Sequence, residues 1–196
     1  MAIAYDETYF SGGGNIGGYD NYSEPNYRDT STRTGQLIQK TVDSGINIVG
    51  KKVLVLGCAY GYLVKHLVSL GVDAYGLDIS TFAISQAPQE IASRVFVGDA
   101  RLESSYTQAK TLAGLTKPNE KFDLIADEDM ISCLTDAEAV AFCTLSKKYS
   151  SMFYHLIDVS PHLAQWYNLH TVAEWKAIVG TGPKEKWFER FSWEEK

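Results

Sequence analysis

Four groups of residues in this chain have side chains or a backbone shape that could hold a polar ligand. Residues 57–61 read Gly-Cys-Ala-Tyr-Gly, a turn whose backbone can approach a ligand closely. The other three groups are acidic: Asp78, Asp99, and the run that starts with Asp127 and Glu128. Carboxylates accept hydrogen bonds from hydroxyl and amino groups. The pattern therefore indicates a site for a nucleotide-like molecule, with the glycine turn leading into a helix N-terminus.

Short apolar runs precede each of these groups. We expect strands at residues 53–56, 73–77, 94–97, 122–126 and 152–159, and a last strand in the alternating stretch 184–193. Strand-then-helix units in succession predict a doubly wound, mainly parallel α/β sheet of about six or seven strands, covered by helices in a three-layer sandwich. Ligands of such sheets lie beyond the carboxyl ends of the strands, which is where the four groups would meet.

Helices are predicted between the strands. Their expected ranges are 34–49, 62–70, 80–87, a weakly patterned stretch before Pro118, and two segments that begin near 135 and 171. The last two start with a capping box, in which a threonine is followed three residues later by a glutamate (Thr135 with Glu138, Thr171 with Glu174).

Length, charge and cysteine content narrow the class of protein. At 196 residues the chain fits one domain, expected over residues 35–196. A net charge of −6 weighs against a nucleic-acid partner. Three scattered cysteines predict neither a disulfide framework nor a metal site, and they favour a reducing cytoplasmic location. We find no apolar run long enough for a membrane span and no signal-peptide pattern at the N-terminus.

Residues 1–34 differ from the rest of the chain in composition. Six aromatic residues are interleaved there with a glycine-rich run at 11–18, and no Gly-Lys-Ser/Thr motif is present. One interpretation is a flexible tail. The other is a lid whose aromatic rings fold over the domain and help to close a pocket, because each ring carries a large area that can be buried.

The glycine turn distinguishes between two kinds of nucleotide ligand. Asp78 follows Gly57 by 21 residues, close to the interval of about 20 at which an acid reaches ribose hydroxyls in dinucleotide sites. A dinucleotide fingerprint also needs glycines in a Gly-x-Gly-x-x-Gly frame. Counted from Gly57, the second and third glycine positions hold Ala59 and Tyr62, and Tyr62 is bulky where close packing is required. The frame that fits is Gly-x-Gly-x-Gly with alanine in the middle.

With this frame the chain resembles the class I S-adenosylmethionine-dependent methyltransferases. The resemblance covers roughly residues 35–180 and rests on four motifs in their expected order. These are Val-Leu-Val-Leu-Gly-Cys-Ala-Tyr-Gly-Tyr-Leu-Val (53–64), Ala-Tyr-Gly-Leu-Asp-Ile-Ser (74–80), Val-Gly-Asp-Ala-Arg (97–101) and Phe-Asp-Leu-Ile (122–125).

The resemblance implies a role for each motif. Residues 57–61 (Gly57, Cys58, Ala59, Tyr60 and Gly61) would cradle the amino-acid end of S-adenosylmethionine. Asp78 would accept hydrogen bonds from both ribose hydroxyls, and Ile79 would lie against the adenine. Asp99 would accept the adenine amino group, and Ala100 would donate its backbone N–H to a ring nitrogen. Asp127 or Glu128 would lie near the methionine portion and the transferred methyl.

The chemistry of the acceptor is less visible in the sequence. Methyl transfer needs mainly alignment, and a general base is required only if the acceptor loses a proton. The candidate bases are Glu128, Asp129 and His170, with His155 and His162 as further histidines. Trp166 and Tyr167 could wall an acceptor pocket. The acidic chain, without a DNA methyltransferase signature after the fourth strand, favours a small-molecule or sugar-like acceptor, and a protein or RNA acceptor stays open.

Two other functions stay open. Val55 stands where the family often has an acid, Ala59 replaces the middle glycine, and the chain lacks the family's usual closing hairpin. These departures fit a protein that binds S-adenosylmethionine with altered or no methyltransferase activity. The strand, turn and ribose acid also occur in nicotinamide-dependent oxidoreductases, which the glycine frame disfavours.

Overall fold

The computed structural model describes residues 4–11, 19, 22–24, 47–150, 152–158, 168–180 and 185–190. Six parallel strands form one sheet in the order β3-β2-β1-β4-β5-β6. The strands are β1 (Lys52–Leu56), β2 (Asp73–Asp78), β3 (Val95–Val97), β4 (Leu124–Glu128), β5 (Phe153–Asp158) and β6 (Glu185–Arg190). The order reverses direction between β1 and β4, and such a switch point is where open α/β sheets bind their ligands.

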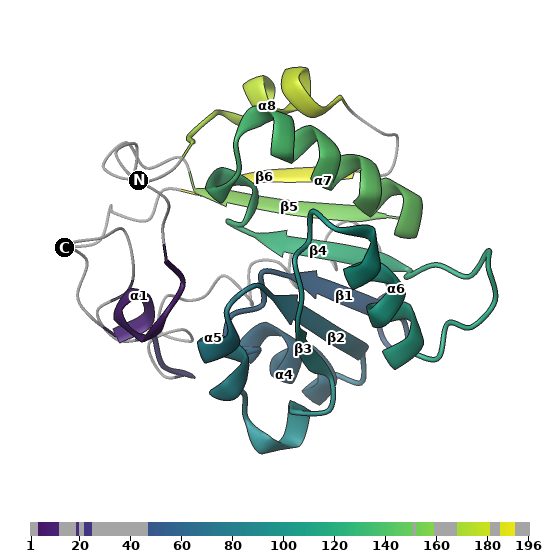
Figure 1. Cartoon of the computed structure of the whole chain (residues 1–196). Helices are drawn as coiled ribbons and strands as arrows, with labels where there is room; N and C mark the ends of the chain where they lie inside the picture. The colour runs from purple at the N-terminus through teal and green to yellow at the C-terminus, as the bar shows by residue number, and fades with distance from the viewer. Residues whose placement is uncertain are drawn as a thin grey trace.

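Helices pack on both faces of the sheet (Figure 1). They are α1 (Glu7–Ser11), α4 (Tyr62–Ser69), α5 (Thr81–Ser85), α6 (Glu103–Leu112), α7 (Asp136–Tyr149) and α8 (Val172–Val179), with short 3-10 helices η2 (Gln89–Ile91) and η3 (Ile131–Cys133). Strand alternation divides the core. Leu54 and Leu56 of β1 pack with α6, α7 and α8, whereas Val53 and Val55 pack with α4 and η2.

The predicted architecture is confirmed. Each expected strand is present to within a few residues, and both capping boxes form as their spacing predicts. Strand β4 is the informative difference, because it runs on to Glu128 instead of stopping at residue 126. Of the helix expected at 34–49, residues 34–46 lie outside the described residues and 47–49 are not helical. None of the helices in the described ranges is long and apolar enough to cross a bilayer.

The strand arrows in Figure 1 point toward α1, which lies beyond the carboxyl edge of the sheet. Helix α1 is short, and two of its residues, Tyr9 and Phe10, are buried. They pack beside α5 with Ala83. Helix α1 is thus placed over the edge where the candidate site is expected.

Candidate functional site

The turn after β1 is held in a tight left-handed path. Gly57, Ala59 and Gly61 have φ values of 64°, 49° and 80°. Alanine adopts this region at a cost of about 1 kcal/mol, so Ala59 is strained. The side chains of Cys58 and Tyr60 are 5% and 8% exposed. Burial, with the charge of Asp78 adding, raises the pKa of the Cys58 thiol well above its ordinary value. These two residues therefore present mainly backbone to a ligand.

Asp78 fixes the turn to the end of β2. Its Oδ2 accepts the backbone N–H of Ala59 at 2.8 Å, and its Oδ1 accepts that of Ser80, also at 2.8 Å. Burial raises the pKa of Asp78, while these two hydrogen bonds act in the opposite direction. A carboxylate has about four acceptor positions, so two remain on this side chain for hydroxyl donors.

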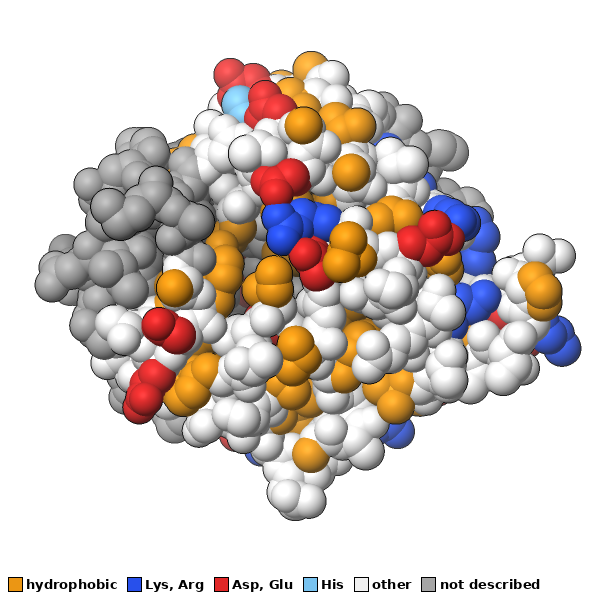
Figure 2. Space-filling view, in the orientation of Figure 1, with side chains coloured by type: hydrophobic (Ala, Val, Ile, Leu, Met, Phe, Trp, Pro, Cys, Tyr) orange, Lys and Arg blue, Asp and Glu red, His pale blue; other side chains and the backbone are white. Residues whose placement is uncertain are grey.

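Exposed apolar side chains flank Asp78. Ile79 is 47% exposed, Val97 at the end of β3 is 44% exposed, and Leu102 at the start of α6 is 54% exposed. Figure 2 shows hydrophobic side chains gathered in the neighbourhood of β3 and α5 on this face. Side chains of this kind next to a buried carboxylate suit a planar, largely apolar ring system beside a hydroxyl-bearing sugar.

Asp99 is engaged by a neighbour that the motif did not reveal. Arg101 donates from Nε to Oδ1 of Asp99 at 2.9 Å and from Nη2 to Oδ2 at 2.7 Å. Arg101 also pairs with Glu138 on α7. The Arg101 guanidinium holds the pKa of Asp99 below its usual range. Next to it, Ala100 is buried and its carbonyl accepts a hydrogen bond from the Tyr106 hydroxyl.

Asp127 does not reach the ligand edge. Its side chain is 0% exposed, and both carboxylate oxygens are used. Oδ1 accepts the backbone N–H of Met130 at 3.0 Å, and Oδ2 lies 2.6 Å from Nδ1 of His155. The expectation of a ligand contact is corrected for a simple reason. Because β4 continues to Glu128, Asp127 is still within the strand, and alternation turns it toward the α6 and α7 face.

The next two acids lie at the rim of the sheet. Glu128 is the last residue of β4, and Asp129 follows with a φ of 61°. Both are partly exposed. The backbone N–H of Asp129 donates to the Leu156 carbonyl at 2.7 Å, which fixes this left-handed residue beside β5. Met130 then lies over the glycine turn, since a Cβ built on Gly57 would be 2.9 Å from its Cγ.

Tyr5 bridges the two sides of the switch point. Its carbonyl accepts the Ser80 hydroxyl at 2.5 Å on the β2 side. Its side chain lies near Cys133 on the β4 side and lowers the pKa of that thiol, against the larger effect of burial. Burial raises the pKa of the Cys133 thiol to about 12, with contributions from the charges of Asp129, Asp127 and Asp78. The acids of the two strands and this N-terminal tyrosine therefore belong to one local environment.

An aromatic cluster joins the N-terminal residues to the turn. Phe10 lies 5.2 Å from the Tyr60 ring, and Tyr22 lies 4.9 Å from it. Tyr22 also stacks on Tyr62 at 5.6 Å. Glu24 pairs with Lys65 of α4 at 2.9 Å. These contacts place aromatic rings at the start of α4, where a dinucleotide would need space for its pyrophosphate.

The histidine candidates fall into different environments. His170 lies 3.1 Å from Asp136 of α7 and edge-on to Trp175, at the α7–α8 side of the molecule. His155 is buried with Asp127. His162, Trp166 and Tyr167 lie outside the described residues. Within the described ranges, no three His, Cys, Asp or Glu side chains are grouped so that they could hold a metal ion.

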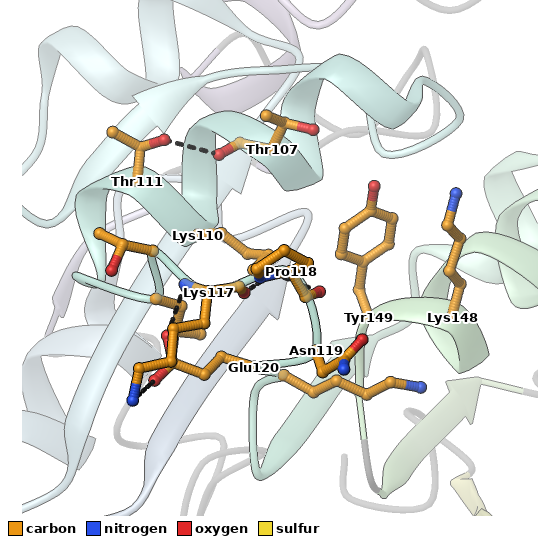
Figure 3. A pocket seen from close by; sticks show the side chains of 12 residues that line it. Thr107, Lys110, Thr111, Lys117, Pro118, Asn119, Glu120, Lys148 and Tyr149 are labelled. Atoms are coloured by element: carbon orange, nitrogen blue, oxygen red, sulfur yellow. Dashed lines mark hydrogen bonds and ion pairs between the residues drawn. The ribbon is translucent and has the colours of Figure 1, made fainter.

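A separate cavity of about 810 Å³ lies between the loop after α6 and the end of α7 (Figure 3). It is near the amino ends of the strands, away from the glycine turn. Three of the lysines that line it have structural partners: Lys110 donates to the carbonyls of Lys117 and Pro118, Lys117 pairs with Glu120, and Lys148 pairs with Glu103. This cavity therefore adds nothing to the candidate site.

Comparison with known proteins identifies the family. A family model described as a methyltransferase domain matches residues 48–179, more than half of the chain. The chain belongs to this family. The matched range contains the glycine turn, Asp78, Asp99 and the acids after β4, so this methyltransferase domain is the part of the chain that carries the candidate site.

Relatives and solved structures agree with this assignment. Ubiquinone biosynthesis O-methyltransferases of Stutzerimonas stutzeri (strain A1501) and Paraburkholderia phymatum are 29% and 30% identical over 122 residues, 61% of this chain and 50% of each relative. The chain thus spans about half the length of the curated relatives it matches.

Magnesium protoporphyrin IX methyltransferase of Synechocystis PCC 6803, solved with bound SAH, is 18% identical with a TM-score of 0.56, over 75% of this chain and 69% of that chain. The expected methyltransferase family and fold are confirmed.

Sequence reasoning gave no role to Arg101 or Met130, and it placed Tyr5 only among the aromatic residues that could form a lid. Arg101 stands two residues after Asp99, a spacing that could have suggested the pair. Met130 meets Gly57 only through folding of distant segments, and no local signal marks this contact.

Proposed function

We propose that this methyltransferase domain binds S-adenosylmethionine at the carboxyl ends of β1, β2 and β4. The observation that carries the proposal is Asp78, a buried carboxylate at the carboxyl end of β2 that holds the glycine turn and keeps acceptor positions for ribose hydroxyls. Exposed Ile79 and Val97 would cover the adenine faces. The backbone of residues 57–61 would hold the amino-acid end. The residues present fit the cofactor.

The resemblance also gave Asp99 a place at the adenine. Its carboxylate is bound by Arg101 through two oxygens, so an adenine amino group would share this acceptor with the guanidinium. We propose that Asp99, while paired with Arg101, and the backbone of Ala100 line the adenine end of the site. Asp127 has no exposed surface, so it would support the turn after β4 from beneath the site and make no ligand contact.

We propose methyl transfer to a small molecule as the reaction, with an acceptor oxygen suggested by the O-methyltransferase relatives. When bound, the cofactor supplies an electrophilic methyl group on a sulfonium. A hydroxyl acceptor must lose its proton, and Glu128 or Asp129 at the rim of β4 would take it. His170 is the less favourable base, since Asp136 and Trp175 already hold its ring.

We propose that the N-terminal aromatic residues form a lid on the site. The carbonyl of Tyr5 accepts the Ser80 hydroxyl and the Tyr5 side chain lies near Cys133. Phe10 is 2% exposed and packs against Tyr60 and Phe82. A ligand on the glycine turn would lie beneath these rings. The free cysteines Cys58, Cys133 and Cys143 support the cytoplasmic location.

The proposal is tested by titrating the wild-type protein and the variant Ile79→Ser with S-adenosylhomocysteine (SAH). Half of this side chain is exposed, and its burial by adenine contributes about 1 kcal/mol. We expect a Kd roughly five- to tenfold higher, with Tm unchanged because the side chain has few contacts to lose. Val140→Ser on α7, 41% exposed, is the matched control and should leave the Kd unchanged. Absence of SAH binding by the folded wild-type protein would refute the proposal.

Binding without turnover is the second candidate, supported by strained Ala59 at the turn. Incubation with S-adenosylmethionine and a panel of small hydroxyl-bearing compounds separates the two. Formation of SAH that depends on one compound supports transfer, whereas tight binding with no product from any of them supports the second candidate. Competition with NADH addresses the nicotinamide alternative, which the aromatic rings at the start of α4 disfavour.

A further inference from the structure

A buried polar pair lies within the sheet beneath the site. The strand registers place Leu56, Asp127, His155 and Trp187 side by side on β1, β4, β5 and β6. Asp127 and His155 are both 0% exposed. Nδ1 of His155 lies 2.6 Å from Oδ2 of Asp127. Since an ionised carboxylate can only accept a hydrogen bond, Nδ1 carries the proton in this pair.

The histidine ring is fixed by aromatic neighbours on the other side. It stacks on the Trp187 indole with ring centroids 3.7 Å apart and an interplanar angle of 21°. Phe153 packs edge-on against it at 4.1 Å. The ring therefore presents its Nδ1 donor to β4 in one direction, and little freedom is left to rotate away.

The second oxygen of Asp127 holds the turn after β4. Oδ1 accepts the backbone N–H of Met130 at 3.0 Å and that of Ile131 at 3.4 Å, at the start of η3. One carboxylate thus ties β5, through His155, to the backbone of this turn. If the histidine donor is lost, a buried carboxylate oxygen loses its partner, which is a costly state. The carboxylate must then rotate toward another partner, and this rotation alters its bonds to the turn after β4.

This turn forms one wall of the candidate site. Met130 lies over Gly57, where an added Cβ would approach its Cγ to 2.9 Å. Asp129 is held at a φ of 61° immediately before it. Cys133, at the end of η3, lies near the Tyr5 side chain. A shift of Asp127 would therefore move Met130, Asp129 and the β4-side anchor of the N-terminal residues together.

We propose that His155 is a positioning residue that sets the affinity of this site for S-adenosylmethionine, acting through Asp127 and touching no ligand. The proposal rests on the proposed function, because it takes S-adenosylmethionine as the ligand. The residues that contact the ligand are those named in the proposed function, and His155 is not one of them. His155 determines how well the β4 wall is placed against the glycine turn.

The test compares two substitutions by titration with SAH. His155→Phe keeps an aromatic ring on Trp187 but removes the donor. His155→Asn loses the ring but restores a donor, because its amide nitrogen is bonded to Cγ as Nδ1 is. We expect the Kd to rise at least tenfold in His155→Phe and to stay within threefold of wild type in His155→Asn. A purely space-filling role predicts the reverse order and would overturn the proposal.

Two further proteins separate positioning from loss of stability. Phe122→Leu removes contacts of a fully buried side chain at the amino end of β4, so it should lower Tm and leave the Kd unchanged. Asp127→Asn/His155→Phe replaces the unpaired charge with a neutral amide that still accepts from Met130, and it should bind within threefold of wild type. If His155→Phe does not fold, the double variant decides, and weak binding by that folded protein overturns the proposal. Failure of wild type to bind SAH would instead refute the proposed function.

Discussion

Gly61 is the position where the backbone of the turn, the start of α4 and the neighbouring β3 layer meet, and Gly61→Ala tests this packing. Gly61 has a φ of +80°, and a Cβ there would lie 2.6 Å from Cδ1 of Ile91 and 3.2 Å from Cγ1 of Val95. The left-handed backbone costs alanine about 1–2 kcal/mol. Overpacking against a buried neighbour adds about 1–3 kcal/mol.

Gly114→Ala supplies the matched control. Gly114 has a φ of +69°, and no atom lies within 4 Å of a Cβ placed there. The two variants share the backbone cost and the effect of alanine on the unfolded chain. The difference between them therefore measures the clash alone, about 2 kcal/mol in the middle of the expected range. For a protein of this size that is roughly 4–8 °C in Tm, measured by circular dichroism on heating.

A rescue variant identifies the atom responsible. Ile91→Val removes Cδ1, the atom nearest to the added Cβ, and costs about 1 kcal/mol by itself. In the double variant Gly61→Ala/Ile91→Val the two losses should be less than additive, because the clash is gone. Equal Tm losses in Gly61→Ala and Gly114→Ala, or full additivity in the double variant, would refute the reasoning.

Three further predictions concern the site. Burial raises the pKa of Asp78, so the stability that comes from its bound proton is present at low pH and is lost as pH rises above about 4. The Tm of Asp78→Asn should therefore rise relative to that of wild type between pH 4 and 7. A Tm difference that stays constant over this range would contradict the prediction. Arg101 lowers the pKa of Asp99, so the stability from this ion pair is present above about pH 4 and is lost as pH falls further. Because the Arg101 side chain is partly exposed, Arg101→Gln should lower the free energy of unfolding by at most about 1 kcal/mol near pH 7 and by less at pH 3, measured by urea unfolding. Phe10→Ala should make the N-terminal residues more sensitive to limited proteolysis and should speed SAH dissociation. The loss of unfolding free energy should be smaller than the about 3–5 kcal/mol expected for a core phenylalanine, because the lid can leave while the sheet stays folded. Unchanged proteolysis would argue against a lid.

The strands and capped helices were predictable because their signals are local. An apolar run such as residues 53–56 can be satisfied only in the centre of a parallel sheet. A capping box such as Thr135 with Glu138 needs nothing beyond four consecutive residues to form. The edge of the sheet at which Asp78 lies follows from these elements, because parallel strands share their carboxyl end.

Contacts between distant segments were not predictable in the same way. Tyr5 and Cys133 are separated by most of the domain, and composition gave residues 1–34 two interpretations of similar weight. The bond from Ser80 to Tyr5 exists because the end of β2 and the N-terminal residues meet beyond the sheet. The roles proposed for Glu128, Asp129 and the turn backbone stay predictions until a ligand is bound.

Asp78 and Asp127 show why acids near the carboxyl ends of two strands have different environments. Each stands at or near the carboxyl end of a strand that pairs with β1, and each accepts backbone N–H groups of adjacent turns. Asp78 is the last residue of β2, at the carboxyl edge of the sheet, where we propose that its remaining acceptor positions meet ribose hydroxyls. Asp127 comes one residue before the end of β4 and pairs with His155 within the sheet. A difference of one residue in position along the strand therefore separates a carboxylate at the carboxyl edge of the sheet from one that is paired within it.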